Sequence, residues 1–118
     1  MHKIATISAF ILTLIMYSCG TDSQTEKNNE KFDSKKWKTG DFRTKGKMTD
    51  NILNDSLLIG KTKAEILEML GDPDQYNERI FHYAVDPGVK YMNEPWIYWL
   101  SVDFDTINDT VRDVWLAD

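Results

Sequence analysis

The sequence has few of the residues that cross-link a chain or bind transition metals. Its 118 residues include one cysteine, Cys19, and two histidines, His2 and His82. A single cysteine excludes an intramolecular disulfide, and the same counts exclude a zinc site built from histidine and cysteine ligands. A folded domain in this chain must therefore depend on packing, for which the hydrophobic content of 42 % and the four tryptophans provide the material.

Basic residues are in the minority. The 14 Lys and Arg against 19 Asp and Glu give a net charge of −5. Nucleic acids attract clustered Lys and Arg, so this balance argues against a nucleic-acid partner. It argues equally against electrostatic binding of the chain to anionic lipid. Attachment to a membrane would have to come from another feature of the sequence.

Long hydrophobic runs are also missing. The longest uncharged and mostly apolar run covers residues 4–17, which is short of the roughly 20 residues that a membrane-spanning helix needs. Lys3 precedes this run. A short apolar core after a positively charged start is typical of a signal peptide, so we predict that residues 1–18 are one.

The residues at the end of this run resemble the lipobox of bacterial lipoproteins: Met16, Tyr17, Ser18, Cys19 and Gly20. In that motif a lipid is attached to the cysteine sulfur and the chain is cut just before it. The usual leucine three residues before the cysteine is Met16 here, and Tyr17 is bulkier than the common small residue. The resemblance implies a lipid on Cys19, a membrane as a partner, and a place in the cell envelope, at the outer membrane. The alternatives are an ordinary cleaved signal and an uncleaved anchor.

The remaining chain divides into a tether and one domain. Residues 20–31 contain no large apolar residue, a composition typical of a flexible spacer. We therefore predict a lipidated N-terminus and tether over residues 19–31. A chain of this length has room for one further domain, which we place at residues 32–118.

The clearest predicted element is a short helix over residues 63–70. Thr62 and Glu65 have the spacing of a capping box, in which the Thr hydroxyl accepts the Glu amide and the Glu carboxylate reaches back. The apolar residues on one face of this helix are Ile66, Leu67 and Leu70. Gly71 can adopt the left-handed conformation that ends a helix, and Pro73 prevents its continuation.

The other elements follow from periodicity. Met48 and Ile52 predict an earlier helix over residues 43–55. Runs rich in β-formers, separated by turn residues, predict strands over residues 78–85, 96–104 and 110–116. Hairpins between them would make an antiparallel sheet. The expected fold is therefore an α+β domain of two layers, with two short helices packed on a three-stranded antiparallel sheet.

Alternation along the strands assigns the faces of the sheet. In the strand over 96–104, the expected core face holds Trp96, Tyr98, Leu100, Val102 and Phe104, and the other face holds Ile97, Trp99, Ser101 and Asp103. In the last strand, Arg112, Val114 and Leu116 compete with Val111, Asp113 and Trp115 for the core face. A β-bulge could serve both sets.

Residues 58–74 resemble the signature of the SmpA/OmlA family, the BamE-like lipoprotein domain. The family shows a glycine, a capping Ser or Thr, a short helix and then Leu-Gly-x-Pro, and the matching residues here are Gly60, Thr62, Glu65, Leu70, Gly71 and Pro73. Segments 80–83, 100–104 and 111–114 are similar to the family's later strands. The resemblance implies a helix-helix-three-strand fold. Its best-known members are outer-membrane lipoproteins of the machinery that inserts β-barrel proteins, although no partner-binding residue of those members maps onto this chain.

The sequence contains no group of residues that predicts catalysis. His82 lies in the middle of a predicted strand, where a structural histidine is far commoner than a catalytic base. Two pairs of aspartates, at 72 and 74 and at 103 and 105, flank single residues in turns. Two carboxylates are too few for Ca²⁺, which takes six to eight oxygen ligands. We therefore predict a protein that is not an enzyme and has no metal or cofactor.

The open face of the sheet is the candidate partner-binding surface. Trp99 and Ile97 should lie on it, with Trp115 as a third candidate, because helices cover the other face and tryptophan is a favoured interface residue. The alternative is that Phe32 and Trp37 fold back over this face. Two functions remain open. One is a lipid-anchored protein-binding module, such as an accessory of β-barrel assembly. The other is an inhibitor or sensor that binds a soluble periplasmic protein or a small ligand.

Overall fold

The structure is a computed structural model that describes residues 28–118. The predicted signal peptide, Cys19 and tether residues 20–27 lie outside this part of the chain. The first described residues already contact the domain, because the Glu30 amide donates to the Lys47 carbonyl (3.1 Å) and Arg43 donates to the Asn28 side chain (3.0 Å). Within residues 28–118, no helix has both the length and the apolar character that crossing a membrane requires.

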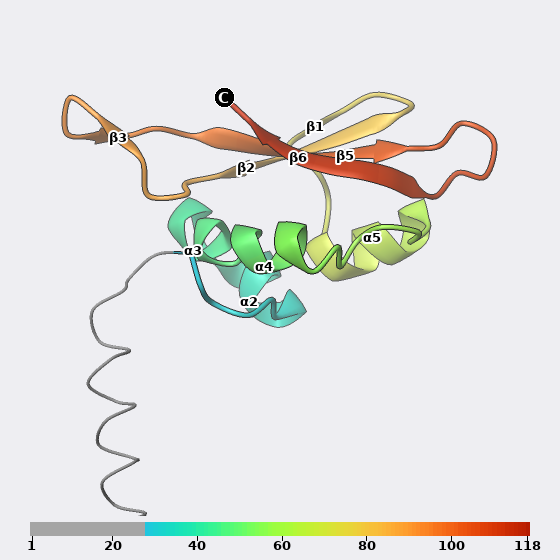
Figure 1. The fold of residues 1–118 in the computed structure, drawn as a ribbon, viewed down its shortest axis with the longest axis horizontal. Coiled ribbons are helices and arrows are strands. Elements are labelled where there is room, and N and C mark those ends of the chain that lie inside the picture. The colour runs from blue at the N-terminus through green and yellow to red at the C-terminus, as the bar shows by residue number, and fades with distance from the viewer. Residues whose placement is uncertain (1–27) are drawn as a thin grey trace, which may run out of the picture.

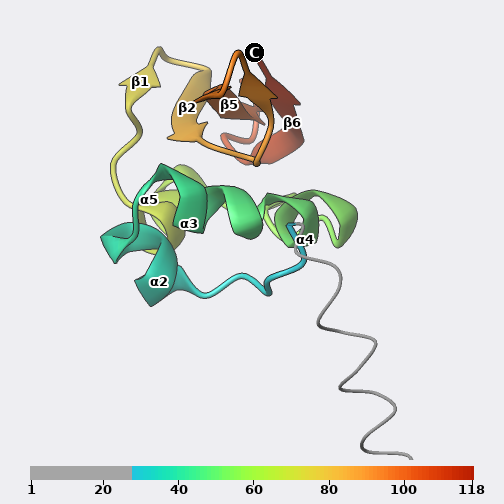
Figure 2. The same ribbon diagram turned by 90° about the vertical axis from the view of Figure 1, so that its left-hand side faces the viewer.

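A layer of short helices packs on one face of an antiparallel sheet (Figures 1 and 2). The helices are α2 (Ser34–Thr39), α3 (Phe42–Lys47), α4 (Thr49–Asn54) and α5 (Lys63–Leu70). The sheet has the order β1-β2-β5-β6, formed by β1 (Gln75–Tyr76), β2 (Ile80–Val85), β5 (Tyr98–Phe104) and β6 (Val111–Ala117). A separate small hairpin, β3 (Lys90–Tyr91) and β4 (Glu94–Pro95), extends from one end of the sheet.

The α+β class and the antiparallel pairing are confirmed, but the predicted count of three strands is wrong, because β1 makes a fourth. The Asn77 side-chain oxygen accepts the amides of Arg79 (2.8 Å) and Ile80 (2.9 Å). This turn brings Gln75 and Tyr76 back alongside His82 and Phe81.

The helix predicted over residues 43–55 is in fact two helices, α3 and α4. Met48 separates them, with φ −98° and ψ −4°. Gly46 explains where α3 lies, because a Cβ at this position would collide with the Asp86 carbonyl in the loop after β2. Glycine therefore lets the helix approach this loop closely, and the Thr49 hydroxyl donates to the Gly46 carbonyl (2.7 Å).

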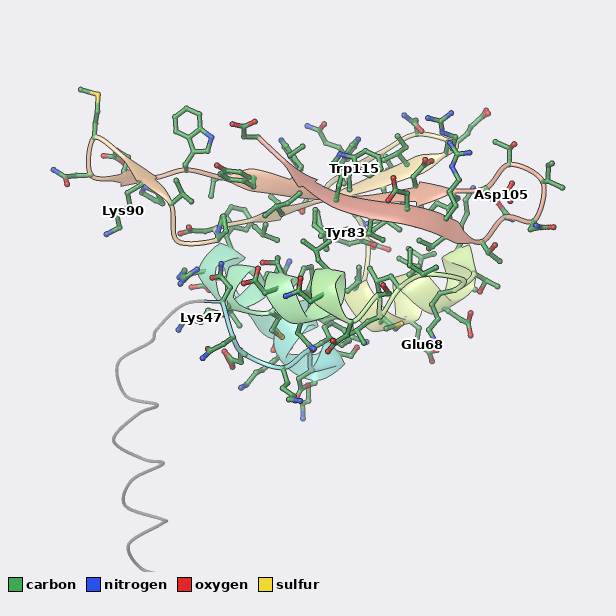
Figure 3. All side chains as sticks on the ribbon, in the orientation of Figure 1. Lys47, Glu68, Tyr83, Lys90, Asp105 and Trp115 are labelled. Atoms are coloured by element: carbon green, nitrogen blue, oxygen red, sulfur yellow. The ribbon has the colours of Figure 1, made fainter. Side chains whose placement is uncertain are left out.

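Helix α2 was not predicted, and it supplies the largest side chain of the core. Asp33 caps it by accepting the amides of Lys35 and Lys36. Trp37 is fully buried, with its ring 6.2 Å from that of Tyr83. Figure 3 shows Tyr83 between the sheet and the helices. The alternative in which Phe32 and Trp37 cover the other face of the sheet is therefore wrong.

The predicted helix over 63–70 is confirmed with both of its ends. The Thr62 hydroxyl accepts the Glu65 amide (3.2 Å), and the Glu65 carboxylate accepts the Thr62 amide (2.9 Å). Gly71 ends the helix with φ 80° and ψ −166°. The positive φ was expected, but this ψ belongs to a region that essentially only glycine visits, rather than to the left-handed helical region.

The faces of β5 agree with the prediction inside the strand and disagree before it. Leu100, Val102 and Phe104 are fully buried in the core. Trp96, which we expected beside them, precedes β5 and is 40 % exposed. Its amide donates to the Val89 carbonyl (2.9 Å), which ties it to the loop that carries the small hairpin. The alternation between the two faces therefore begins within β5 and does not include Trp96.

A β-bulge sets the register of β6. Val111 pairs with Phe104, but the next pair is Asp113 with Asp103, so the register shifts between them. Val111 is buried, and Val114 and Leu116 pack against the core. The core face therefore receives Val111 from one of the two predicted sets, and Val114 and Leu116 from the other. A β-bulge was the arrangement expected to allow this.

The outer edge of β6 is partly covered within the described chain. Val111 bonds through its amide and carbonyl to Lys61 and Gly60 (2.8 Å each). Farther along the strand, the Asp113 carboxylate accepts the amide of Val114 (2.9 Å).

Candidate protein-binding surface

The sheet face that points away from the helices is called the outer face here. No described element packs over it (Figure 2). Strand pairing places the following residues on it: His82, Ala84, Trp99, Ser101, Asp103, Asp113, Trp115 and Ala117. Figure 3 shows Trp115 on this side of the sheet.

A shallow hollow of about 250 Å³ lies in the outer face. Its lining residues come from all four strands of the sheet and from the end of the sequence: Gln75, His82, Trp99, Ser101, Trp115, Ala117 and Asp118. Trp99 and Trp115 are both half-buried, so each ring packs against the sheet and still offers surface to a partner. The floor of the hollow is made by a polar pair.

The polar floor consists of His82 and Ser101, which face each other across β2 and β5. His82 Nδ1 lies 2.9 Å from the Ser101 hydroxyl oxygen, and the His82 ring stands edge-on to Trp99 at 6.1 Å. Ser101 is only 1 % exposed, so a substrate could not reach its oxygen. The contact fixes the orientation of the imidazole and satisfies a buried hydroxyl, and it thereby supports Trp99.

A charged cluster lies beside the hollow on the same face. Asp103 is 5 % exposed, and its two carboxylate oxygens accept from Arg79 and Arg112 (3.0 Å each). Buried carboxylates need such partners. The cost of burying the Asp103 carboxylate is therefore offset locally, and this explains how an acidic residue lies on a packed sheet surface.

The structure brings together two of the three predicted partner-binding residues. Trp99 and Trp115 line the same hollow. Ile97 precedes β5 and is half-buried outside the hollow. Sequence reasoning missed His82 and Gln75 as neighbours of these tryptophans, because their position depends on the pairing of β1, β2 and β5. Cys19, the predicted lipidation site, lies outside the described residues.

The residues of the family-like motif lie apart from the outer face. Thr62, Glu65 and Leu70 belong to α5 and its cap, and Leu70 is buried. Gly60 bonds to β6, and the Gly71 carbonyl accepts from the Tyr83 hydroxyl (2.8 Å). These residues, with Pro73, therefore join the helical layer to the sheet.

A second hollow, of about 430 Å³, opens between α5 and the β1 edge. It is lined by Leu67, Asp72, Pro73, Tyr76 and Phe81. Leu67, which we expected on the apolar face of α5, is 39 % exposed, and Tyr76 is 72 % exposed. This hollow is larger in volume than that of the outer face, but Asp72 is the one charged residue in its lining.

Among residues 28–118, no three His, Cys, Asp or Glu side chains lie close enough to hold a metal ion. The aspartates flagged in the sequence have other partners. Asp74 accepts the Ala84 amide (2.8 Å), and Asp105 accepts the Ile107 amide (2.8 Å) within its own turn.

Comparisons with known proteins add no assignment: no protein-family model, curated protein or solved structure matches this chain.

Proposed function

We propose that this chain is a lipid-anchored protein-binding module of the bacterial cell envelope. Cys19 carries the lipid, and the outer face of the sheet binds a partner protein. The observation that carries the proposal is the hollow in the outer face, where Trp99 and Trp115 remain half-buried with no described element over them. Tryptophan is among the residues most enriched at the energetic centres of protein interfaces.

The size of the hollow favours a protein over a small ligand. Binding sites for small molecules usually enclose about 300–1,000 Å³ and bury most of the ligand. The hollow of about 250 Å³ is open and shallow. It fits one apolar side chain of a partner, with the surrounding strands as a flat contact surface.

The half of the chain that forms the sheet is acidic overall. Residues 71–118, which include the whole sheet, contain ten acidic and three basic residues. Complementary potentials speed association and select partners. Beside the hollow itself, however, Asp103 is paired with the two arginines Arg79 and Arg112, so the acidic surplus lies mainly elsewhere in this half of the chain and does not define the charge of the partner at the hollow.

The resemblance of residues 58–74 to the SmpA/OmlA family supports a more specific role, that of an accessory in β-barrel assembly at the outer membrane. The two-layer arrangement expected for that family, with helices on one face of the sheet, would leave the outer face for a partner. A fold shared by several roles does not select one of them. The inhibitor or sensor function is therefore retained as an outcome of the experiment below.

The test is site-specific photo-crosslinking in intact cells. A photoreactive phenylalanine replaces Trp115 in the hollow, and the matched control carries it at Ile107, which is 86 % exposed in the turn before β6. We expect a crosslinked protein from position 115 only. Barrel-assembly components identified by mass spectrometry would support the accessory role, whereas a soluble periplasmic enzyme would favour the inhibitor. Equal crosslinking from both positions would contradict the outer face as the binding site.

A further inference from the structure

Charge is divided unequally between the two layers of the domain. Residues 34–47, which form α2 and α3, contain six basic residues and one acidic residue. The sheet half is strongly acidic, as described above. The net charge of the whole chain conceals this division. The negative net charge argued against binding to anionic lipid, but that argument does not hold for α2 and α3.

The basic residues lie on the side of the domain opposite the outer face. Helix α2 is the element farthest from the sheet (Figures 1 and 2). Because Trp37 points into the core, helical geometry directs Lys35 away from it, and Lys35 is exposed. We call the exposed lysines of this side the basic face: Lys31, Lys35, Lys36, Lys38 and Lys47.

Three acidic residues lie in or just before residues 34–47, namely Asp41 within them and Glu30 and Asp33 before them, and each has a local partner. Asp33 and Asp41 accept backbone amides as helix N-caps. Glu30 pairs with Lys36 (2.8 Å). The acidic residues that border the basic face belong to the neighbouring helices: Asp50 and Asp55 around α4, and Glu68 in α5. The basic face is thus a bounded patch, centred on α2.

The described chain begins on this same side. Glu30 bonds to Lys47 at the end of α3, and the Phe32 amide donates to the Asn51 side chain (2.7 Å). Only nine residue steps separate Asn28 from Cys19. A chain of that length spans at most about 30 Å, so a lipid on Cys19 holds the basic face near the bilayer.

We propose that the basic face rests on the anionic lipid headgroups of the membrane that holds the lipid anchor. This inference rests on the proposed anchor at Cys19. Lysines close to an anionic bilayer are attracted by its surface potential. The contact orients the domain, so that the outer face with Trp99 and Trp115 is directed away from the membrane, where a partner protein can reach it.

The test uses the mature, lipidated chain in vesicles of phosphatidylcholine, alone or mixed with phosphatidylglycerol or phosphatidylserine. A water-soluble acylating reagent modifies the lysines, and mass spectrometry measures the rate at each one. We expect Lys35 and Lys47 to react several-fold more slowly in both anionic mixtures than in phosphatidylcholine, because the attraction depends on charge alone. High salt should remove this protection. Lys61 and Lys90, outside the basic face, should react equally in all vesicles.

Charge reversal provides the matched variants. Lys35→Glu with Lys47→Glu should abolish the protection of Lys38 in anionic vesicles, whereas Lys61→Glu with Lys90→Glu should preserve it. Flotation with pure phosphatidylcholine vesicles tests the anchor separately. A chain that floats, but whose lysines react equally in neutral and anionic vesicles, would overturn the orientation and leave the anchor standing. A chain that does not float would overturn both.

Discussion

Trp99 is the residue on which the proposed interface depends most directly. Its ring packs edge-on to His82 and lines the hollow with Trp115. We expect Trp99→Ala to weaken partner capture by a factor of 30 or more, since a central interface tryptophan contributes about 2 kcal/mol or more. Because the ring is half-buried, the domain itself should lose only about 1–2 kcal/mol of unfolding free energy. Pull-down titration and urea unfolding measure the two effects.

Trp96→Ala is the control for that substitution. Trp96 is 40 % exposed and does not line the hollow, so its removal should leave partner capture close to that of the wild type. If the two variants captured the partner equally well, Trp99 would have no part in binding.

Tyr83 predicts how stability depends on alkaline pH. Burial raises the pKa of its phenol above the ordinary value, and the carboxylates of Asp72 and Asp74 raise it further. The neutral phenol is therefore favoured in the folded state. Its contribution is fully present below the unfolded-state pKa of about 10, and it is lost as pH rises through the folded-state pKa.

Tyr83→Phe should therefore reduce the loss of stability between pH 9 and about pH 11 that the wild type shows. At neutral pH the variant should be less stable by about 1–2 kcal/mol, because the Gly71 carbonyl loses the Tyr83 hydroxyl as its donor. Urea unfolding at several pH values measures both effects, with Tyr76→Phe, in a ring that is 72 % exposed, as the control. Parallel pH profiles for wild type and Tyr83→Phe would refute the assignment.

At the scale of elements, Gly71 determines how α5 meets the sheet. Its φ of 80° and ψ of −166° are strained for any other residue. A Cβ here would lie 3.5 Å from Lys38, an ordinary contact, so the penalty comes from the backbone alone. We expect Gly71→Val to lower the unfolding free energy by about 1–3 kcal/mol, measured by thermal and urea unfolding.

Gly71→Asn distinguishes the observed conformation from the usual helix end. Asparagine tolerates the left-handed helical region, but that region does not include a ψ of −166°. The Asn variant should therefore lose about as much stability as Gly71→Ala. Near-complete rescue by asparagine would show that α5 ends in the left-handed helical conformation after all.

The elements differ in how far the sequence could predict them. The capping box of α5 is made by residues three apart, so Thr62 and Glu65 could be recognised without knowledge of the fold. Helix α2 has six residues, of which Trp37 alone is buried, so it shows no periodic pattern. The position of α3 depends on the close approach of Gly46 to Asp86, and β1 depends on a single Asn77 turn. Such contacts cannot be read from local spacing.

The candidate site shows the same division. Alternation along β5 places Trp99 and Leu100 on different faces of the sheet, and this part of the prediction agrees with the observed strand. Trp115 could not be assigned to a face beforehand, because a bulge between Val111 and Asp113 shifts the register. The hollow itself requires the pairing of β2, β5 and β6, which brings His82 to Ser101 across nineteen residues of sequence.

At the scale of the whole molecule, the proposed function depends on Cys19. We predict that this residue carries acyl chains in the mature protein, which anchor it at about 0.8 kcal/mol per buried CH₂. Cys19→Ser should accumulate as an uncleaved precursor, whereas Ser18→Ala, which keeps a small residue before the cysteine, should be processed. Cell fractionation and mass spectrometry of the N-terminal peptide measure the outcome. Normal processing of Cys19→Ser, together with an unlipidated wild-type peptide, would remove the anchor from the proposal.

The partly covered edge of β6 has a consequence for the proposed membrane-anchored protein. Molecules confined to two dimensions collide often and in similar orientations, so a bare strand edge would invite neighbouring copies to join into continuous sheets. Here Gly60 and Lys61 form backbone hydrogen bonds with Val111 at the start of that edge. The Asp113 carboxylate accepts the Val114 amide, and its negative charge repels the same residue of another copy. For the proposed membrane-anchored protein, this covering would hinder pairing between copies along the edge and leave Trp99 and Trp115 for the proposed partner protein.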